Sequence, residues 1–138
     1  MSRGRANHHL YLARLLLDGW EAQRAAGAAP ADILDAAHAP GVREHLLAAY
    51  GWYLLAVLDP TGDPDGPPPR CCAELPQPAA GIALPAELRE FAQLEREGWL
   101  AALLAPLPAA LPARSRVPGN LLAAEQALPD PAQARSWH

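Results

Sequence analysis

The sequence contains no lysine, so its eleven basic residues are all arginine, and it has two cysteines and one phenylalanine. Val, Ile, Phe, Tyr and Thr are scarce, and because these residues favour strands, their scarcity argues against a β-sheet. Cys71 and Cys72 are adjacent and could pair only with strain, which excludes a framework of disulfides and favours reduced thiols in a cytoplasmic protein. The net charge is −4 and no dense basic run is present, so nucleic acid is not an expected partner.

Long uncharged stretches are also missing. The apolar run 46–58 is far shorter than the roughly 20 residues that cross a bilayer as a helix. A second uncharged stretch, 99–113, contains prolines that would break a helix. We therefore expect no membrane segment and a cytoplasmic location.

Alanine and leucine supply most of the apolar residues, which make up 51% of the chain, and both are strong helix formers. Apolar residues at spacings of three and four predict an all-α fold, a small helical bundle of three long helices plus short helices in a single domain, 1–138. We place the long helices at about 6–26, at about 42–58, and from about 85 to the proline at 106. Asn7 is a candidate N-cap of the first helix, and Gly27 is a candidate stop at its end.

Proline- and glycine-rich stretches separate these helices. Pro40 and Gly41 are expected to end a short helical segment, 31–38, before the second long helix begins. Segment 59–85 is interpreted as a long, partly mobile surface loop, because it has too few large apolar groups to offset its ordering entropy. We expect a proline-rich connection at 106–118, a short helix at 120–128 and a tail at 129–138. None of these proline-rich stretches is expected to contribute to the core.

Two stretches resemble a known family. Residues 7–20, Asn-His-His-Leu-Tyr-Leu-Ala-Arg-Leu-Leu-Leu-Asp-Gly-Trp, look like the first helix of a family of small all-helical bacterial proteins, whose members carry Asn-Gln-x-x-Tyr-Phe-Ala there. Residues 43–51, Arg-Glu-His-Leu-Leu-Ala-Ala-Tyr-Gly, are similar to the Arg-Glu-His start of the family's next long helix, and residues 99–104 resemble its third helix more weakly. The resemblance covers about half of the chain. It implies an all-helical fold and brings no activity with it.

The sequence departs from the family pattern in two places. His8 stands where the family has glutamine, which puts any polar role of that glutamine in doubt. The family continues with a final helix after a tryptophan like Trp137, whereas this chain ends at His138. Without that helix, we expect an apolar groove on the bundle.

Arg43, Glu44 and His45 form the most interesting polar cluster, at the start of the most apolar helix. With Asn7 or His8 they could form a small ligand-binding or acid–base pocket, in which His45 carries the proton. The interpretation that we favour is structural: Glu44 complements the helix dipole, while Arg43 and His45 make hydrogen bonds.

No residue set demands a metal or a cofactor. Asp35 and His38 have the spacing of the carboxylate–histidine pairs in di-iron bundles, but such bundles need a second pair and two more inward carboxylates. The adjacent thiols could act as a redox switch only with a lowered pKa, for which Arg70 is the evident positive neighbour. We therefore expect neither a metal site nor a reactive thiol.

The four tryptophans are mainly core candidates, and one or two at a surface groove would mark a binding hot spot. Trp137 and Trp99 are the candidate interface residues, and Trp137 is the one that we most expect to be exposed. We expect a non-enzymatic helical module that binds another protein or a second copy of itself. The alternative is an enzyme or small-ligand binder that uses residues 43–45. A nucleic-acid role for Arg114 and Arg116 is a weaker third hypothesis.

Overall fold

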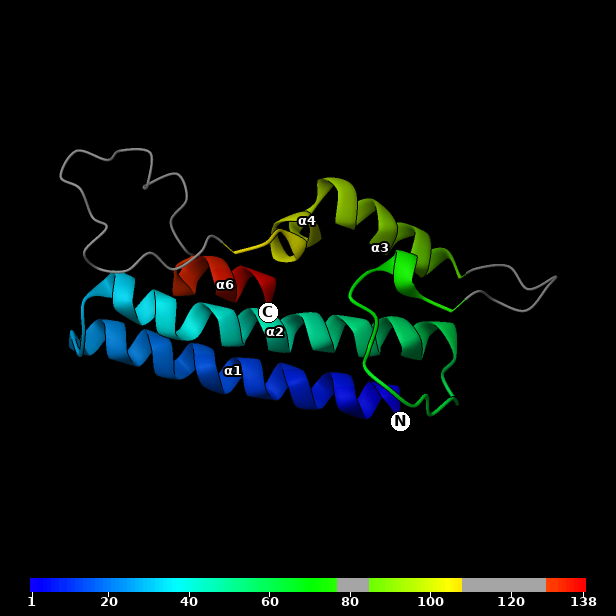
Figure 1. The fold of residues 1–138 in the computed structure, drawn as a ribbon, viewed down its shortest axis with the longest axis horizontal. Helices are drawn as coiled ribbons and strands as arrows, with labels where there is room; N and C mark the ends of the chain where they lie inside the picture. The colour runs from blue at the N-terminus through cyan, green and yellow to red at the C-terminus, as the bar shows by residue number, and fades with distance from the viewer. Residues whose placement is uncertain (77–84, 108–128) are drawn as a thin grey trace.

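The computed structural model describes residues 1–76, 85–107 and 129–138, and its regular elements are helices (Figure 1). The α-helices are α1 (Ser2–Ala26), α2 (Ala31–Leu58), α3 (Ala86–Glu97), α4 (Trp99–Leu104) and α6 (Pro131–Trp137), and η1 (Cys72–Glu74) is a single 3-10 turn. No strand occurs in these ranges, so the expected all-α fold is confirmed. None of the described helices combines the length and apolarity that a membrane crossing needs.

α1 and α2 form a long antiparallel hairpin (Figure 1). α1 ends at Gly27, whose φ of 61° is the left-handed conformation that glycine adopts without strain, and the Gly27 N–H donates to the Arg24 carbonyl. Gly27 is therefore the stop that the sequence predicts. α1 begins at Ser2, earlier than expected, so Asn7 lies inside the helix and is not its N-cap.

The seam between α1 and α2 is the main hydrophobic core. Leu17 and Trp20 of α1 and Val42 and Leu54 of α2 are fully buried there. Burial of each side chain of this size stabilises the fold by roughly 1.5–3 kcal/mol. α2 also contacts α3, α4 and α6, which explains why its sequence is apolar over most of its circumference.

α2 is one helix of 28 residues, so the predicted break at Pro40 and Gly41 is wrong. Proline costs a helix interior about 3 kcal/mol, through one lost hydrogen bond and a steric clash. Pro40 itself is exposed, whereas Ala39 and Val42 beside it are buried in the core. The buried face that begins at Leu34 thus continues past the proline, and its burial offsets the cost.

The predicted third long helix is two helices joined at Gly98. Gly98 is extended, with φ −103° and ψ −164°, between the end of α3 and the start of α4. A Cβ at this position would lie 2.7 Å from the Leu94 side chain and 3.1 Å from the Leu94 carbonyl oxygen, so a larger residue would require Leu94 to shift. The break directs Leu100 and Leu103 of α4 into the core, where both are buried.

Residues 59–76 leave the end of α2, pass the start of α1 and cross the hairpin to η1, and they are anchored to both helices (Figure 1). The Met1 ammonium lies 2.7 Å from Asp63, near the start of α1. Farther along, the Pro69 carbonyl lies directly on Gly51 of α2, so closely that a Cβ on Gly51 would be 2.0 Å from the carbonyl oxygen. The backbone of this segment therefore packs against the backbone of the hairpin.

This segment also contributes to the core, contrary to the prediction for the proline-rich stretches. Cys72 and Leu75 are partly buried and pack against core residues. The remainder of the predicted loop, 77–84, lies outside the described residues. So do the predicted helix and most of the predicted connection, which fall within 108–128.

α6 occupies most of the predicted tail. The Asp130 carboxylate caps it by accepting from the Gln133 N–H at 2.8 Å, and Pro131 takes the first helical position, where its missing N–H costs nothing. α6 packs against α1, α2 and α4, so Trp137 is only 8% exposed. The expectation that Trp137 is exposed is therefore wrong.

Replacement of Pro40 tests whether α2 is continuous. Pro40→Ala should raise the free energy of unfolding by up to about 3 kcal/mol, because alanine restores the missing helical hydrogen bond. Urea unfolding followed by circular dichroism measures the change. Pro60→Ala, in the turn after α2, is the matched control and should give no such gain. A Pro40→Ala variant no more stable than the wild-type protein would contradict the continuous helix.

Candidate functional site

Arg43 joins α2 to the end of α4. Its Nε donates to the Leu103 carbonyl at 3.1 Å, and its Nη2 donates to the Leu104 carbonyl at 3.0 Å. The last carbonyls of a helix have no partner within it, so this guanidinium caps α4. Burial lowers the pKa of Arg43, although a guanidinium stays charged at neutral pH.

Glu44 and His45 contact other partners. Both carboxylate oxygens of Glu44 accept from Arg70, at 2.9 and 3.1 Å, and this pairing lowers the pKa of Glu44. His45 Nδ1 lies 3.1 Å from Nδ1 of His9 on α1. Consecutive helical residues point about 100° apart. The three side chains therefore contact different partners, although Arg43 and Glu44 also form an ion pair of 3.5 Å with each other.

Asn7 and His8 have no hydrogen bond with residues 43–45, although the His8 ring lies edge to face with His9, at 5.9 Å between ring centroids. Asn7 lines the groove described below, whereas His8 is exposed in a separate hollow beside Arg5. His9, which the sequence did not single out, is the residue that meets His45. Burial lowers the pKa of His9 and favours its neutral ring, which suits a hydrogen bond between two imidazoles. The contact between His9 and His45 depends on how α1 and α2 are aligned in the hairpin, which no local sequence pattern specifies.

Asp35 and His38 hold Trp20. The Trp20 indole N–H and Arg24 both donate to Asp35 Oδ1 at 3.0 Å. The His38 ring stacks on the indole, with ring centroids 5.9 Å apart. The buried indole N–H thereby has the hydrogen-bond partner that it needs. In the ranges that the structure describes, no cluster of three or more His, Cys, Asp and Glu is placed to hold a metal ion.

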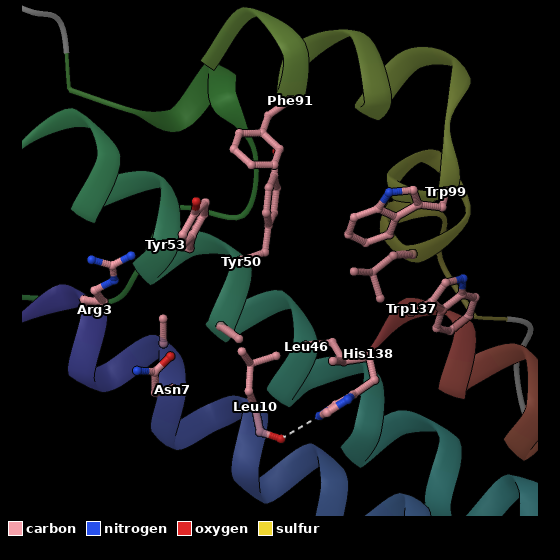
Figure 2. Close-up of a pocket in the computed structure, with 13 residues that line it drawn as sticks. Arg3, Asn7, Leu10, Leu46, Tyr50, Tyr53, Phe91, Trp99, Trp137 and His138 are labelled. Carbon is pink, nitrogen blue, oxygen red and sulfur yellow. Dashed lines mark hydrogen bonds between the residues drawn. The ribbon is translucent and has the colours of Figure 1, made fainter. Parts of the chain in front are cut away.

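The candidate site is an apolar groove of about 370 Å³ between the helices, which we call the aromatic groove (Figure 2). α1 and α2 form its floor, α3 and α4 supply one wall, and the end of α6 closes it. The lining residues are Arg3, Ala6, Asn7, Leu10, Leu46, Ala49, Tyr50, Tyr53, Phe91, Trp99, Leu103, Trp137 and His138.

Aromatic rings form much of this lining. Phe91 packs edge to face on Tyr50 and on Tyr53, with ring centroids 5.8 and 5.6 Å apart. Trp99 is 45% exposed at the groove, whereas Trp137 presents only a small part of its ring. The two candidate interface tryptophans therefore line the same groove, from α4 and α6, although only Trp99 is open to solvent.

Tyr50 and Glu95 fix α3 against α2. The Tyr50 hydroxyl donates to Glu95 Oε1 at 2.5 Å, and the Cys72 N–H donates to the same oxygen at 2.8 Å. Burial and this contact raise the pKa of Tyr50 far above its ordinary value, so the phenol stays protonated. Burial also raises the pKa of the Cys72 thiol, which opposes the thiolate that a reactive cysteine needs.

Comparisons of the chain with family models, with curated proteins and with solved structures found no match. The resemblance to the family of small all-helical bacterial proteins stays a prediction from the residues that carry it. The aromatic groove is interpreted from its own geometry.

Tyr50→Phe should lower the free energy of unfolding by about 1.5–3 kcal/mol, because it removes a hydrogen bond to a charged carboxylate. Tyr53→Phe is the matched control: its ring also packs on Phe91, but its hydroxyl has no hydrogen bond to a described residue. It should change the stability by less than about 0.5 kcal/mol. Urea unfolding of both variants measures the difference, and equal effects would contradict the role of the Tyr50 hydroxyl.

Proposed function

We propose that this protein binds an apolar ligand in the aromatic groove. The observation that carries the proposal is the cavity of about 370 Å³, whose lining is mainly apolar and aromatic with a few polar groups at its edge. Ligand sites in proteins are typically concave, apolar and of roughly 300–1,000 Å³, with a small number of polar groups that orient the ligand. The aromatic groove has each of these features.

Well-anchored walls support the proposal, because a groove that is already formed loses little conformational entropy on binding. Arg43 holds the end of α4 against α2, and the Tyr50–Glu95 hydrogen bond holds α3. Arg135 holds α6 against acidic side chains of α1, at 2.7 and 3.0 Å. Each helix of the wall is thus tied to the hairpin by a polar contact as well as by apolar packing.

The alternative role, as an enzyme or ligand binder at residues 43–45, has weaker support. Arg43, Glu44 and His45 already contact the α4 carbonyls, Arg70 and His9 respectively. A ligand there would have to displace these contacts, whereas a ligand in the aromatic groove displaces none of them.

Self-association is a second candidate function, and an exposed apolar pair on α1 favours it. Tyr11 and Leu15 are 58% and 50% exposed and lie one turn apart on the helix. A second copy of the chain could pack the same pair against this one about a twofold axis, as most homodimers do. This surface is separate from the aromatic groove, whose lining includes neither residue.

The first test uses N-phenyl-1-naphthylamine, a neutral dye that fluoresces in apolar sites. Trp99→Ala should weaken dye binding about tenfold, equivalent to about 55 Å² of lost apolar contact. Ile33→Ala removes a side chain that is similarly exposed, 47% against 45%, but lies outside the groove, and it should leave dye binding unchanged. Circular dichroism checks that both variants fold. Absence of dye binding to the wild-type protein, or equal losses in the two variants, would contradict the proposal.

Self-association has its own test in sedimentation of the pure protein at micromolar concentration. Association through the exposed pair would give a wild-type dimer that Leu15→Glu converts to a monomer, because a carboxylate would be desolvated at the interface. Ile33→Glu makes the same change at an exposed site on α2 and should leave the dimer intact. A monomeric wild-type protein would count against this candidate function.

A further inference from the structure

Arg3 is the formally charged side chain among the residues that line the aromatic groove. The chain has fifteen Asp and Glu residues and a net charge of −4, yet none of the residues that line the groove is acidic. Arg3 does line it, and Asn7 adds an amide. The His138 ring, which also lines the groove, already contacts the Leu10 carbonyl through its Nε2 at 3.0 Å (Figure 2). The groove is therefore an apolar cavity with one cationic side chain, Arg3, at its edge, and a cation there favours an anionic group on the ligand.

Arg3 is a cation at this edge with no partner among the described residues. Arg5, two residues along α1 and on roughly the opposite side of the helix, pairs with Asp63 at 3.3 Å and lies over the Trp52 ring. Arg3 has no such ion pair or hydrogen bond within the described ranges. Asn7 follows one turn later on the same face of α1, and Figure 2 shows both side chains on the α1 side of the groove. An arginine and an amide thus stand beside the same apolar cavity.

We propose that the aromatic groove binds a small monocarboxylate with an unbranched apolar chain. The inference rests on the proposed function and names its ligand. The apolar chain lies over Leu46 and against Phe91 and Trp99, and the carboxylate lies at Arg3 and Asn7. The guanidinium donates to both carboxylate oxygens, and the Asn7 amide supplies a further donor.

The position of Arg3 suits a carboxylate better than a neutral or cationic head group. Arg3 is exposed at the open side of the groove, so the carboxylate keeps part of its hydration and no charge is buried without a partner. An amine would place two positive charges together, and an alcohol would gain no ionic attraction.

The size of the groove favours a small molecule over a docked helix. Its volume of about 370 Å³ is near the lower end of ligand pockets. A helix in a groove uses several apolar anchors spread over two or more turns, which needs a longer furrow. A single apolar chain fills this space.

Isothermal titration calorimetry of the full chain with decanoate, decanol and decylamine tests the head group, with each compound kept below the concentration at which it forms micelles. Decanoate should bind most tightly and decylamine most weakly. Octanoate should bind about 15-fold more weakly than decanoate, because each buried CH₂ changes the affinity about fourfold. Failure of binding to strengthen with chain length would overturn the placement of the chain in the groove.

Arg3→Gln should weaken decanoate binding about fivefold, the size expected of an exposed ion pair, and leave decanol binding unchanged. Arg96→Gln makes the same change of net charge on α3, outside the groove, and should leave decanoate binding unchanged. The pair of variants separates a direct contact with the carboxylate from a general effect of charge.

Two results would overturn the proposal that the ligand is a carboxylate while leaving the proposed function intact. Decanoate could bind no more tightly than decanol, or Arg3→Gln and Arg96→Gln could weaken decanoate binding equally. Failure of all the decyl compounds together with the naphthylamine dye would instead overturn the proposed function itself. Binding to phosphatidylserine vesicles without binding to dissolved decanoate would assign the surface to a membrane lipid and overturn the small-molecule ligand.

Discussion

The apolar seam between α1 and α2 is the contact on which the other described elements depend. Leu17, Trp20, Val42 and Leu54 are fully buried along it. α6 contacts both helices of the hairpin, and α3 and α4 reach α2, so each smaller element packs on a surface that the hairpin provides. Hydrophobic burial has no direction, so it gathers these elements without fixing how they are oriented.

Polar contacts supply the missing orientation. Arg43 donates to the last two carbonyls of α4, Glu95 accepts from both Tyr50 and a backbone N–H, and Arg135 joins α6 to α1. In each case one charged group meets two or more partners, and such hydrogen bonds are both strong and directional. The aromatic groove results from the two effects together, because apolar packing gathers its rings and the polar contacts keep their helices in place.

The sequence predicted the structural features that depend on residues close together in the chain. The all-α class followed from Ala and Leu spacing, and Gly27 marked the end of α1 because the left-handed cap is a property of glycine itself. Pro40 predicted a helix break that is absent, because burial of the neighbouring residues keeps α2 helical through the proline. Gly98 was expected inside one long helix, but α3 ends there in a closely packed turn. Residues 43–45 were recognised as unusual, but their partners are distant in sequence. The burial of Trp137 likewise depends on α6 packing across the hairpin, which no short pattern encodes.

The approach of the Pro69 carbonyl to Gly51 restricts how α2 can rotate. Only a hydrogen side chain leaves room for that oxygen, and the residues on either side of Gly51 are Tyr50 and Trp52, two of the largest. If α2 turned or slipped by one position, an aromatic side chain would fill the space that the carbonyl needs. Slipped pairings of two such Ala- and Leu-rich helices could bury similar apolar area, so burial alone discriminates poorly among them. The segment docked on Gly51 accepts a single register and thereby excludes the slipped ones.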